Sequence, residues 1–345
     1  MSGAVPGDWR HFALDPPRAF GTPPARGRIR VEPEDFVVEE LLDFAPAGDG
    51  PHLLLRVLKR GANTEWVARE LARRAGCRPF EVGFAGLKDR HAVTTQWYTV
   101  PRGKGGAGDW QGLSGEGYRV LEAYAHRRKL PRGALAGNRF ELRIRALEGD
   151  RAALVGRLAQ LGELGAPDYF GPQRFGQGLS NLVRVAAGDY RTDRAFGLSA
   201  ARSLIFNAVL ARRVEEGSWA TLEAGDVANL DGTGSVFDVA AVDATLAARV
   251  TALDVHPTGP SWGAGTSRAG GRVAALEAQV AAGFAPVCAA LEAEGVAMAR
   301  RPLRVAVREL AHEFAGDDLL LRFRLAADSF ATTVLREVLD VAGDR

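Results

Sequence analysis

The chain has 345 residues, 46% of them hydrophobic and 25% charged, which is more than one ordinary hydrophobic core requires. The longest apolar stretch, 280–291, is interrupted by Gly283 and Pro286 and is too short to cross a bilayer, and Asp8 and Arg10 stand where a signal peptide would be apolar. Composition therefore favours a two-domain cytoplasmic protein and argues against a membrane partner.

The formal net charge of +2 does not by itself indicate a nucleic-acid-binding protein, but basic residues are concentrated in two regions. Residues 122–145 contain seven basic residues and two acidic ones. The second region contains Arg56, Lys59, Arg60, Arg69, Arg73 and Arg74. A protein that neutralises phosphates requires such regions, although a solvated surface gives the same pattern.

Neither the two cysteines nor the six histidines show metal-binding spacing. Cys77 and Cys288 lie far apart without a CxxC pair, and no HxxH or HExxH motif is present. We therefore expect no metal site and no disulfide framework, and we expect both cysteines to be small buried hydrophobes.

Residues 52–58 form an apolar run of strand length. Asn63 is placed to cap a helix, and Gly76 is placed to end it. The apolar positions that recur at helical spacing between them are Trp66, Val67, Leu71 and Ala75. Both elements are expected to be scaffold.

A charge-dense loop, GLKDRHAVTTQ, occupies 86–96 between two apolar runs. An exposed loop aspartate usually forms a turn or a cap. Asp89, however, lies between Lys88 and Arg90, whose positive charges favour the ionised carboxylate and keep it available for attack. Asp89 is therefore a candidate nucleophile that needs no separate base.

Residues 139–145 alternate strictly between apolar and charged, with Phe140 on the apolar face, and this pattern predicts a strand. If the strand extends backwards, Asn138 shares the face of Phe140. The ring offers a base a stacking plane, and the amide can pair with the polar edge of uracil or orient a carboxylate. The alternative is that Phe140 is a plain core residue.

After about residue 164 the chain is rich in Ala, Gly and Leu, and helical periodicity is present over 199–213 and 272–293. Residues 317–325 are predicted to form a strand.

A final helix is expected to begin after Asp328 or Ser329 as its cap, with Phe330 in the first turn and Val334 and Val338 on the same stripe. The helix dipole favours anions at that end, so the Phe330 ring can lie on a base beside a held phosphate. Phe36 offers another such ring, and either one can instead be a core aromatic.

Five motifs, in this order, resemble those of the TruD family of transfer-RNA pseudouridine synthases. They are RVEPEDFVVEE (30–40), GLKDRHAVTTQ (86–96), GNRF (137–140), PDYFGPQRFG (167–176) and SFATTVLREVL (329–339). Each is a modest signal alone, but together they span nearly the whole chain, so chance is a poor explanation.

The resemblance implies an α+β fold, in which a catalytic core with a mixed, mainly antiparallel sheet of the pseudouridine synthase type is interrupted by an inserted α/β TRUD domain. The implied boundaries are 1–164 and 308–345 for the two parts of the catalytic domain and 165–307 for the inserted domain. The inserted domain is expected to form one wall of a basic cleft for structured RNA.

The resemblance also implies isomerisation of uridine 13 in the D-arm of transfer RNA, with glutamate transfer RNA as the expected substrate. By motif position Asp89 is the nucleophile, which attacks either the uracil ring or the anomeric carbon of the ribose, or else assists glycal formation by taking a ribose proton. The extracted base is contacted by Phe36, Asn138, Phe140 and Phe330. Arg30 or Lys88 is placed to neutralise developing charge, although family members often carry Lys where this chain has Arg30. No cofactor, metal or obligate protein partner is implied, and a monomer is expected.

Two other classes of protein stay open. A nucleoside glycosidase that uses Asp89 needs a second carboxylate as acid or base, and the GLKDRHAVTTQ segment contains none. A noncatalytic protein that binds structured RNA would use the same basic and aromatic residues, and unchanged function in an Asp89→Asn variant would indicate it.

Overall fold

The computed structural model describes residues 9–103, 109–186 and 194–342, which form two compact units built from segments distant in sequence. The first, here called the sheet unit, contains Ala25–Asp150, Arg308–Asp328 and the described residues from Asp340 onward. The second, the helical unit, contains the described residues up to Pro24, together with Arg151–Val307 and Ser329–Leu339. The assignment of a catalytic and an inserted domain to 1–164, 165–307 and 308–345 stays a prediction.

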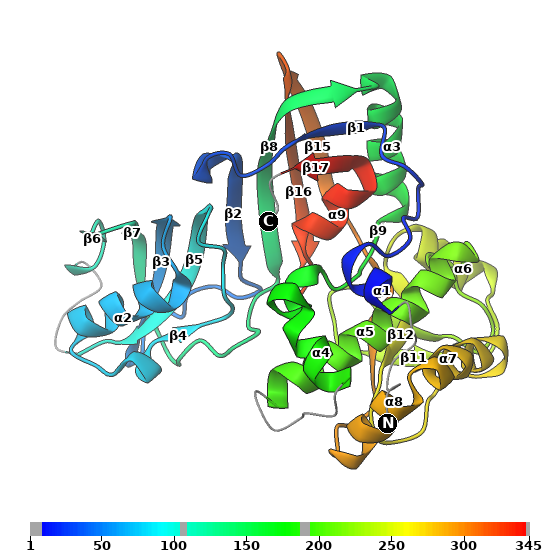
Figure 1. Cartoon of the computed structure of the whole chain (residues 1–345). Helices are drawn as coiled ribbons and strands as arrows, with labels where there is room; N and C mark the ends of the chain where they lie inside the picture. Colours follow the sequence, from blue (N-terminus) through cyan, green and yellow to red (C-terminus); the bar gives the residue numbers. More distant parts are fainter. Residues whose placement is uncertain (1–8, 104–108, 187–193, 343–345) are drawn as a thin grey trace. The chain divides into compact units, whose positions relative to one another are not determined.

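The sheet unit is built on an 11-stranded sheet whose main path runs β15-β16-β8-β2-β5-β3-β7-β6 (Figure 1). Along this path β2 and β5 run parallel and all other neighbours run antiparallel. In addition, β1 pairs with β8 and β17, and β4 pairs with β5. The predicted mixed, mainly antiparallel sheet is therefore confirmed.

The strands of this sheet are β1 (Ala25–Arg28), β2 (Phe36–Leu41), β3 (His52–Arg60), β4 (Gly83–Phe84), β5 (Val93–Pro101), β6 (Ser114–Gly115), β7 (Tyr118–His126), β8 (Gly137–Gly149), β15 (Arg308–Ala315), β16 (Asp318–Ala326) and β17 (Leu339–Ala342). The strands predicted over 52–58, 139–145 and 317–325 are confirmed as β3, β8 and β16. In β8 the alternation is that of a strand with one buried face, since Phe140, Leu142 and Ile144 are all buried.

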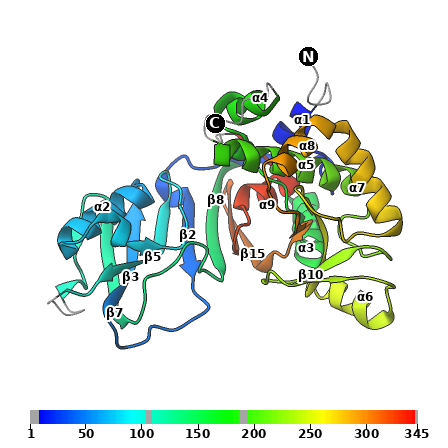
Figure 2. The same ribbon diagram turned by 90° about the horizontal axis from the view of Figure 1, so that it is seen from below.

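One helix, α2 (Thr64–Ala75), covers part of the sheet, and Figure 2 shows it beside β3 and β5. Its buried positions Val67 and Leu71 pack with apolar side chains of β3, β5 and β7. Asn63 occupies the N-cap position as predicted, but its side chain makes no capping hydrogen bond. Gly76 ends the helix as predicted, with a left-handed φ of 65° that a glycine adopts without strain.

The helical unit holds a four-stranded sheet in the order β11-β10-β12-β13 and a separate β14-β9 pair. Its strands are β9 (Ala166–Pro167), β10 (Val227–Leu230), β11 (Val236–Asp238), β12 (Val255–Ser261), β13 (Ala299–Pro302) and β14 (Arg304–Val305). Its helices are α1 (Arg10–Leu14), α3 (Arg151–Leu164), α4 (Ser180–Ala186), α5 (Arg194–Glu215), α6 (Ala244–Thr251), α7 (Gly271–Gly283), α8 (Ala285–Ala293) and α9 (Ala331–Val338).

Helical structure over 199–213 is confirmed as the interior of α5, but the periodic segment 272–293 forms two helices instead of one. The axes of α7 and α8 differ by 95°. Pro286 lies in the first turn of α8, where its missing N–H is tolerated, and it prevents the preceding helix from continuing. Across the part of the chain that the structure describes, no single helix is long and apolar enough to span a membrane, and only this bent pair meets that test when its two helices are taken together.

The last helix, α9, does not begin as predicted. Its N-cap residue is Phe330, in an extended conformation and without a side-chain cap, and not Asp328 or Ser329. Val334 and Val338 are buried, as the predicted stripe requires, and α9 packs against α3 and β9.

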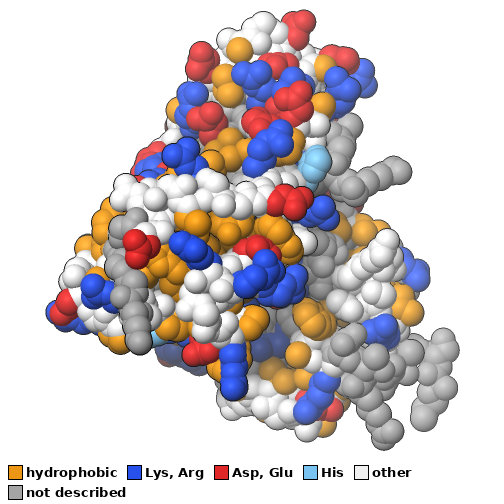
Figure 3. All heavy atoms as spheres, turned by 90° about the vertical axis from the view of Figure 1, so that its left-hand side faces the viewer, with side chains coloured by type: hydrophobic (Ala, Val, Ile, Leu, Met, Phe, Trp, Pro, Cys, Tyr) orange, Lys and Arg blue, Asp and Glu red, His pale blue; other side chains and the backbone are white. Residues whose placement is uncertain are grey.

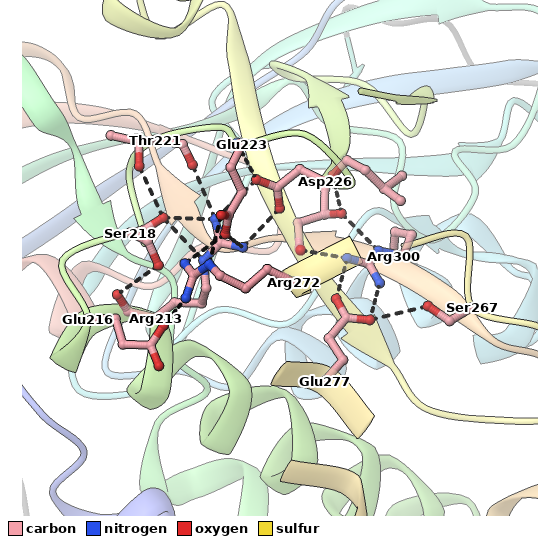
Figure 4. Close-up of polar contacts among 12 residues, drawn as sticks. Arg213, Glu216, Ser218, Thr221, Glu223, Asp226, Ser267, Arg272, Glu277 and Arg300 are labelled. Carbon is pink, nitrogen blue, oxygen red and sulfur yellow. Dashed lines mark hydrogen bonds and ion pairs between the residues drawn. The ribbon is translucent and has the colours of Figure 1, made fainter. Parts of the chain in front are cut away.

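A network of arginines and carboxylates fixes the segments around α5 and α7 (Figure 4). The fully buried Arg213 donates to the Asp226 carboxylate at 2.9 and 3.2 Å and to the Ser218 and Thr221 carbonyl oxygens. Two further arginines pair with carboxylates: Arg272 with Glu216 and Glu223, and Arg300 with Glu277. Because each buried charge here has a partner, the network specifies one arrangement of these segments.

Candidate active site

The loops that carry Arg30 and Asp89 lie at the same edge of the sheet. β2 and β5 run parallel, with Val37 opposite Val93, so the residues that precede the two strands meet at one edge. Arg30 precedes β2 through the short helical turn Pro33–Asp35, and Asp89 precedes β5.

Asp89 presents an exposed carboxylate beside a fixed positive charge. Its side chain is 57% exposed, and Oδ2 accepts a hydrogen bond of 3.0 Å from a guanidinium nitrogen of Arg30. The same guanidinium lies 4.2 Å from the centre of the Phe36 ring, and the Arg30 side chain is only 19% exposed. A carboxylate that is accessible and held beside a cation is suited to nucleophilic attack.

The turn before β2 holds Arg30 in place. Glu32 and Asp35 form a capping box, and Arg145 of β8 binds Asp35 at 2.8 Å. Arg30 itself has a φ of 56°, a left-handed conformation that residues other than glycine seldom adopt. The surrounding contacts therefore keep Arg30 in a backbone conformation that directs its side chain to Asp89.

The backbone of the Asp89 loop is bound by a buried ammonium group. Lys59, the second-last residue of β3, is fully buried and donates hydrogen bonds to the carbonyl oxygens of Ala62 (3.0 Å), Lys88 (3.3 Å) and Asp89 (2.8 Å). Burial lowers the pKa of Lys59 to about 8, and the nearby negative charge of Asp89 opposes that shift. Three acceptors match the three donors of an ammonium group, so the charge is satisfied without an ion pair.

Two further side chains hold the start of the loop. Gln96 in β5 donates to the Gly86 carbonyl oxygen at 2.6 Å, and the Lys88 backbone N–H donates to Thr64 Oγ1 at 3.0 Å. The last residue of the GLKDRHAVTTQ motif thus binds the first one, which closes the loop on the sheet.

The cationic neighbours of Asp89 in sequence do not contact its carboxylate. The Lys88 ammonium pairs with the buried Glu40 at 2.8 Å, and Arg90 donates to the Gly61 carbonyl oxygen at 3.2 Å. The expectation that Lys88 and Arg90 flank the Asp89 carboxylate is therefore corrected, because the cation in contact with it is Arg30.

Asn138 and Phe140 lie on the face of the sheet that holds the Asp89 loop. In the β2–β8 pair Asn138 is opposite Glu40 and Phe140 is opposite Val38, and directly opposed residues share a face. Asn138 Oδ1 is buried and has no hydrogen-bond partner among the residues that the structure describes. A buried amide oxygen without a partner indicates a place for a donor from a ligand.

Phe36 and Phe140 form an aromatic group next to Arg30. Their ring centres are 6.3 Å apart in an edge-to-face arrangement, and Phe140 stacks on Phe323 at 5.3 Å. The two residues are 3% and 6% exposed, so both rings are packed, and their contact with a base remains a prediction. Phe330 belongs to the helical unit, where it is half-buried at the start of α9.

Sequence reasoning did not identify Glu40, Lys59 or Gln96 as residues that hold the loop. The alternation of residues along β3 could have identified Lys59. It lies on the same face as Leu55 and Val57 and therefore places a charge on an apolar face. Glu40 alternates with Phe36 and Val38 in the same way. A charge on a buried face requires partners, and here the loop supplies them.

Most cations of the two basic regions are neutralised within the sheet unit. The ion pairs are Arg56 with Glu39 and Glu122, Arg60 with Glu34, Arg73 with Glu70, Arg127 with Asp49, Arg139 with Glu39, Arg143 with Asp318, and Arg145 with Asp35. By contrast, five exposed cations of these regions pair with no carboxylate in the described parts of the chain: Arg69, Arg74, Arg128, Lys129 and Arg132. We therefore expect phosphate contacts only from the exposed cations that have no carboxylate partner, and not from every basic residue of the two regions.

Neither cysteine is part of the site. Cys288 is buried and burial raises its pKa to about 12, whereas Cys77 is only half-buried. Over residues 9–103, 109–186 and 194–342, no group of three or more His, Cys, Asp or Glu side chains is arranged to hold a metal ion.

Comparison with known proteins gives one consistent result. The family model described as tRNA pseudouridine synthase D (TruD) matches residues 18–188 and 191–338. The tRNA pseudouridine synthase D of Methylococcus capsulatus is 46% identical over 336 residues, covering 94% of each chain, and that of Nitrosococcus oceani is 45% identical over 332 residues, covering 92% of each.

A crystal structure from Methanosarcina mazei, described as a tRNA pseudouridine synthase D, matches with a TM-score of 0.72 over 96% of this chain and 98% of that chain. The two sequences are 20% identical, so this match bears on the fold alone. It confirms the expected α+β fold of the pseudouridine synthase type.

Proposed function

Because the chain belongs to the TruD family of tRNA pseudouridine synthases, we propose that it converts uridine 13 in the D-arm of transfer RNA to pseudouridine, with Asp89 as the nucleophile. Glutamate transfer RNA is the proposed first substrate. The observation that carries the proposal is the exposed Asp89 carboxylate, paired with Arg30 at 3.0 Å on a loop whose backbone is bound by Lys59.

The proposed reaction is an isomerisation in which every atom of the nucleotide is kept. The bond between N1 of uracil and C1′ of ribose breaks, the base rotates, and a bond between C5 and C1′ forms while C5 loses a proton and N1 gains one. Asp89 supplies the nucleophile, and the Arg30 guanidinium stabilises negative charge that develops beside it. Lys88 is assigned an indirect role, because its ammonium pairs with Glu40 and its carbonyl oxygen accepts from Lys59.

The base must leave its stack inside folded RNA before Asp89 can reach it. We propose that Phe36 and Phe140 contact the extracted base and that the unpartnered Oδ1 of Asn138 accepts a hydrogen bond from it. Phe330 is proposed as a further base contact on the basis of its motif alone. A monomeric state and a cytoplasmic location are also part of this proposal.

The test uses unmodified glutamate transfer RNA, carbodiimide treatment and primer extension. Wild-type protein is expected to produce a stop that marks uridine 13, and Asp89→Asn is expected to abolish it while binding of the transfer RNA is retained. Asp49→Asn is the matched control, because Asp49 is also an exposed aspartate paired with an arginine in the sheet unit.

Each other outcome has a definite meaning. Absence of any marked uridine with wild-type protein would exclude the synthase, and release of free uracil would instead indicate a glycosidase. An Asp89→Asn variant that modifies the RNA at the wild-type rate would leave the synthase in place and reject Asp89 as nucleophile.

A further inference from the structure

The sheet unit contains a pocket whose lining includes neither Asp89 nor Arg30. Its volume is about 480 Å³, within the range of roughly 300–1,000 Å³ typical of ligand pockets. It lies between α2, the turn Pro79–Glu81, β4 and the segment 129–132. The side chains around it include Glu65, Arg69, Phe80, Phe84, Lys129 and Arg132.

The cations that line this pocket outnumber its acidic residues. Arg69, Lys129 and Arg132 come from the two different basic regions of the sequence, and the pocket brings them together. None of the three pairs with a carboxylate among the described residues, although most other arginines of these regions do. One acid, Glu65, faces three cations, so the pocket attracts an anion.

An exposed aromatic ring stands beside these cations. Phe80 is 67% exposed, and its ring lines the pocket together with these cations. Figure 3 views the side of the molecule that carries α2 and β6, and it shows Lys and Arg side chains next to hydrophobic ones on this face. A ring and several cations in one pocket match an unstacked base and its phosphate.

Contacts within the protein hold the walls of the pocket. The Arg132 guanidinium is stacked on the Phe84 ring at 3.7 Å, and the Lys129 ammonium donates to the carbonyl oxygen of Phe80. Gly83 allows the segment 129–132 to approach β4, because a Cβ there would lie 2.6 Å from the Leu130 carbonyl oxygen. Little ordering is therefore needed when a ligand enters.

We propose that this pocket binds one unstacked nucleotide of the RNA substrate, other than the uridine that reacts. The base lies on the Phe80 ring, and the phosphate is held by Arg69, Lys129 and Arg132. The inference rests on the proposed function for the identity of the RNA. It adds to that function a second point of attachment, which fixes the position of the RNA on the enzyme.

The test compares binding of unmodified glutamate transfer RNA by wild-type protein, Phe80→Ala, Arg69→Ala and Arg132→Ala. Phe80→Ala is expected to raise Kd about tenfold, in line with the loss of one stacked base. Arg69→Ala and Arg132→Ala are each expected to raise Kd several-fold and to reduce the slope of log Kd against log salt by about 0.7–0.9. The losses should appear in Kd and KM, and not in the rate of pseudouridine formation with the RNA fully bound.

Matched controls are Phe196→Ala, which removes an equally exposed ring from the helical unit, and Arg127→Ala, which removes an exposed cation that is paired with Asp49. Phe80→Ala and Arg69→Ala variants that bind as the controls do would overturn the proposal, as would a loss of rate at unchanged Kd. Failure of the proposed function is read separately, from the absence of pseudouridine with wild-type protein. If wild-type protein formed no pseudouridine but the pocket variants still bound RNA more weakly than the controls, the pocket would remain an RNA-binding site.

Discussion

Lys59 donates a hydrogen bond of 2.8 Å to the backbone carbonyl oxygen of Asp89 from a fully buried ammonium group. The contact joins the sheet to the main chain of the proposed nucleophile and leaves its carboxylate exposed. Lys59 therefore determines where the carboxylate stands without touching the reacting atoms, which makes it a positioning residue.

Lys59→Met removes all three donors and keeps most of the apolar stem. We expect kcat for pseudouridine formation to fall about 10²-fold, because a displacement of about 1 Å at a reacting group costs that much. KM for transfer RNA should change little. Arg73→Met is the control, since Arg73 is an exposed cation paired with Glu70. A Lys59→Met variant with wild-type kcat would show that the loop does not depend on this ammonium.

The pH dependence of the free energy of unfolding tests whether the pKa of Lys59 is lowered in the folded chain. Its pKa in the folded chain is about 8, below the ordinary value of 10.5, so the unfolded chain binds more protons between these values. The contribution of Lys59 to the free energy of unfolding should therefore rise as the pH increases from 8 to 10.5. Urea unfolding across this window should show the rise in wild-type protein and its loss in Lys59→Met, and parallel curves for the two proteins would contradict it.

Arg30 is expected to support the reaction through its charge. Arg30→Lys keeps a positive charge near Asp89 and should retain activity within about tenfold, whereas Arg30→Met should reduce the single-turnover rate about 10²-fold. Arg26→Met is the control, because Arg26 is an exposed arginine paired with Glu148. Equal rates for Arg30→Met and wild-type protein would exclude Arg30 from charge stabilisation.

Asp226 provides a test of the buried network in the helical unit. In Asp226→Asn the nearest carboxylate left to the buried Arg213, among the residues that the structure describes, is that of Glu223 at 3.8 Å. We expect the free energy of unfolding to fall by about 3 kcal/mol, as is typical when one partner of a buried ion pair is removed. Urea unfolding measures the change, and Asp49→Asn, at an exposed pair, should alter it little. A fall no larger than that of Asp49→Asn would show that the network does not fix this unit.

Glu337 in α9 should make the protein more stable in mild acid. It is fully buried, accepts a hydrogen bond from the Ala19 N–H at 2.9 Å, and burial raises its pKa above the ordinary value of 4.5. The folded chain then binds more protons than the unfolded chain, so this contribution is present below pH 4.5 and is lost as the pH rises through the folded pKa. Glu337→Gln should remove that slope in urea unfolding, and an unchanged slope would contradict the assignment.

The elements that sequence predicted well are those whose pattern is local. From Asn138 to Arg145 in β8 every second residue is buried, so strict alternation alone identified the strand. The end of α2 at Gly76 was predictable because it depends only on the backbone conformation of that glycine. The break between α7 and α8 shows the limit of this reasoning, since periodicity continued through a proline that stops the first helix.

Local sequence patterns could not predict which side chains bind the Asp89 loop. Which residues bind the Asp89 loop depends on the register of β2, β3 and β5, and that register joins segments far apart in the chain. Asp89 itself was predicted from its motif, but its contact with Arg30 required the parallel pairing of β2 with β5. Charges at apolar positions, such as Lys59 and Glu40, were the only local indication that such contacts exist.

The pairing of β8 with β16 has a consequence for synthesis on the ribosome. Residues that contact one another across this pair, such as Glu141 and Arg322, are separated by 181 positions. While the intervening helical unit is being translated, β8 emerges with one long edge open, and an open strand edge is prone to aggregation. The nascent chain must therefore keep that edge shielded until its last hairpin leaves the exit tunnel.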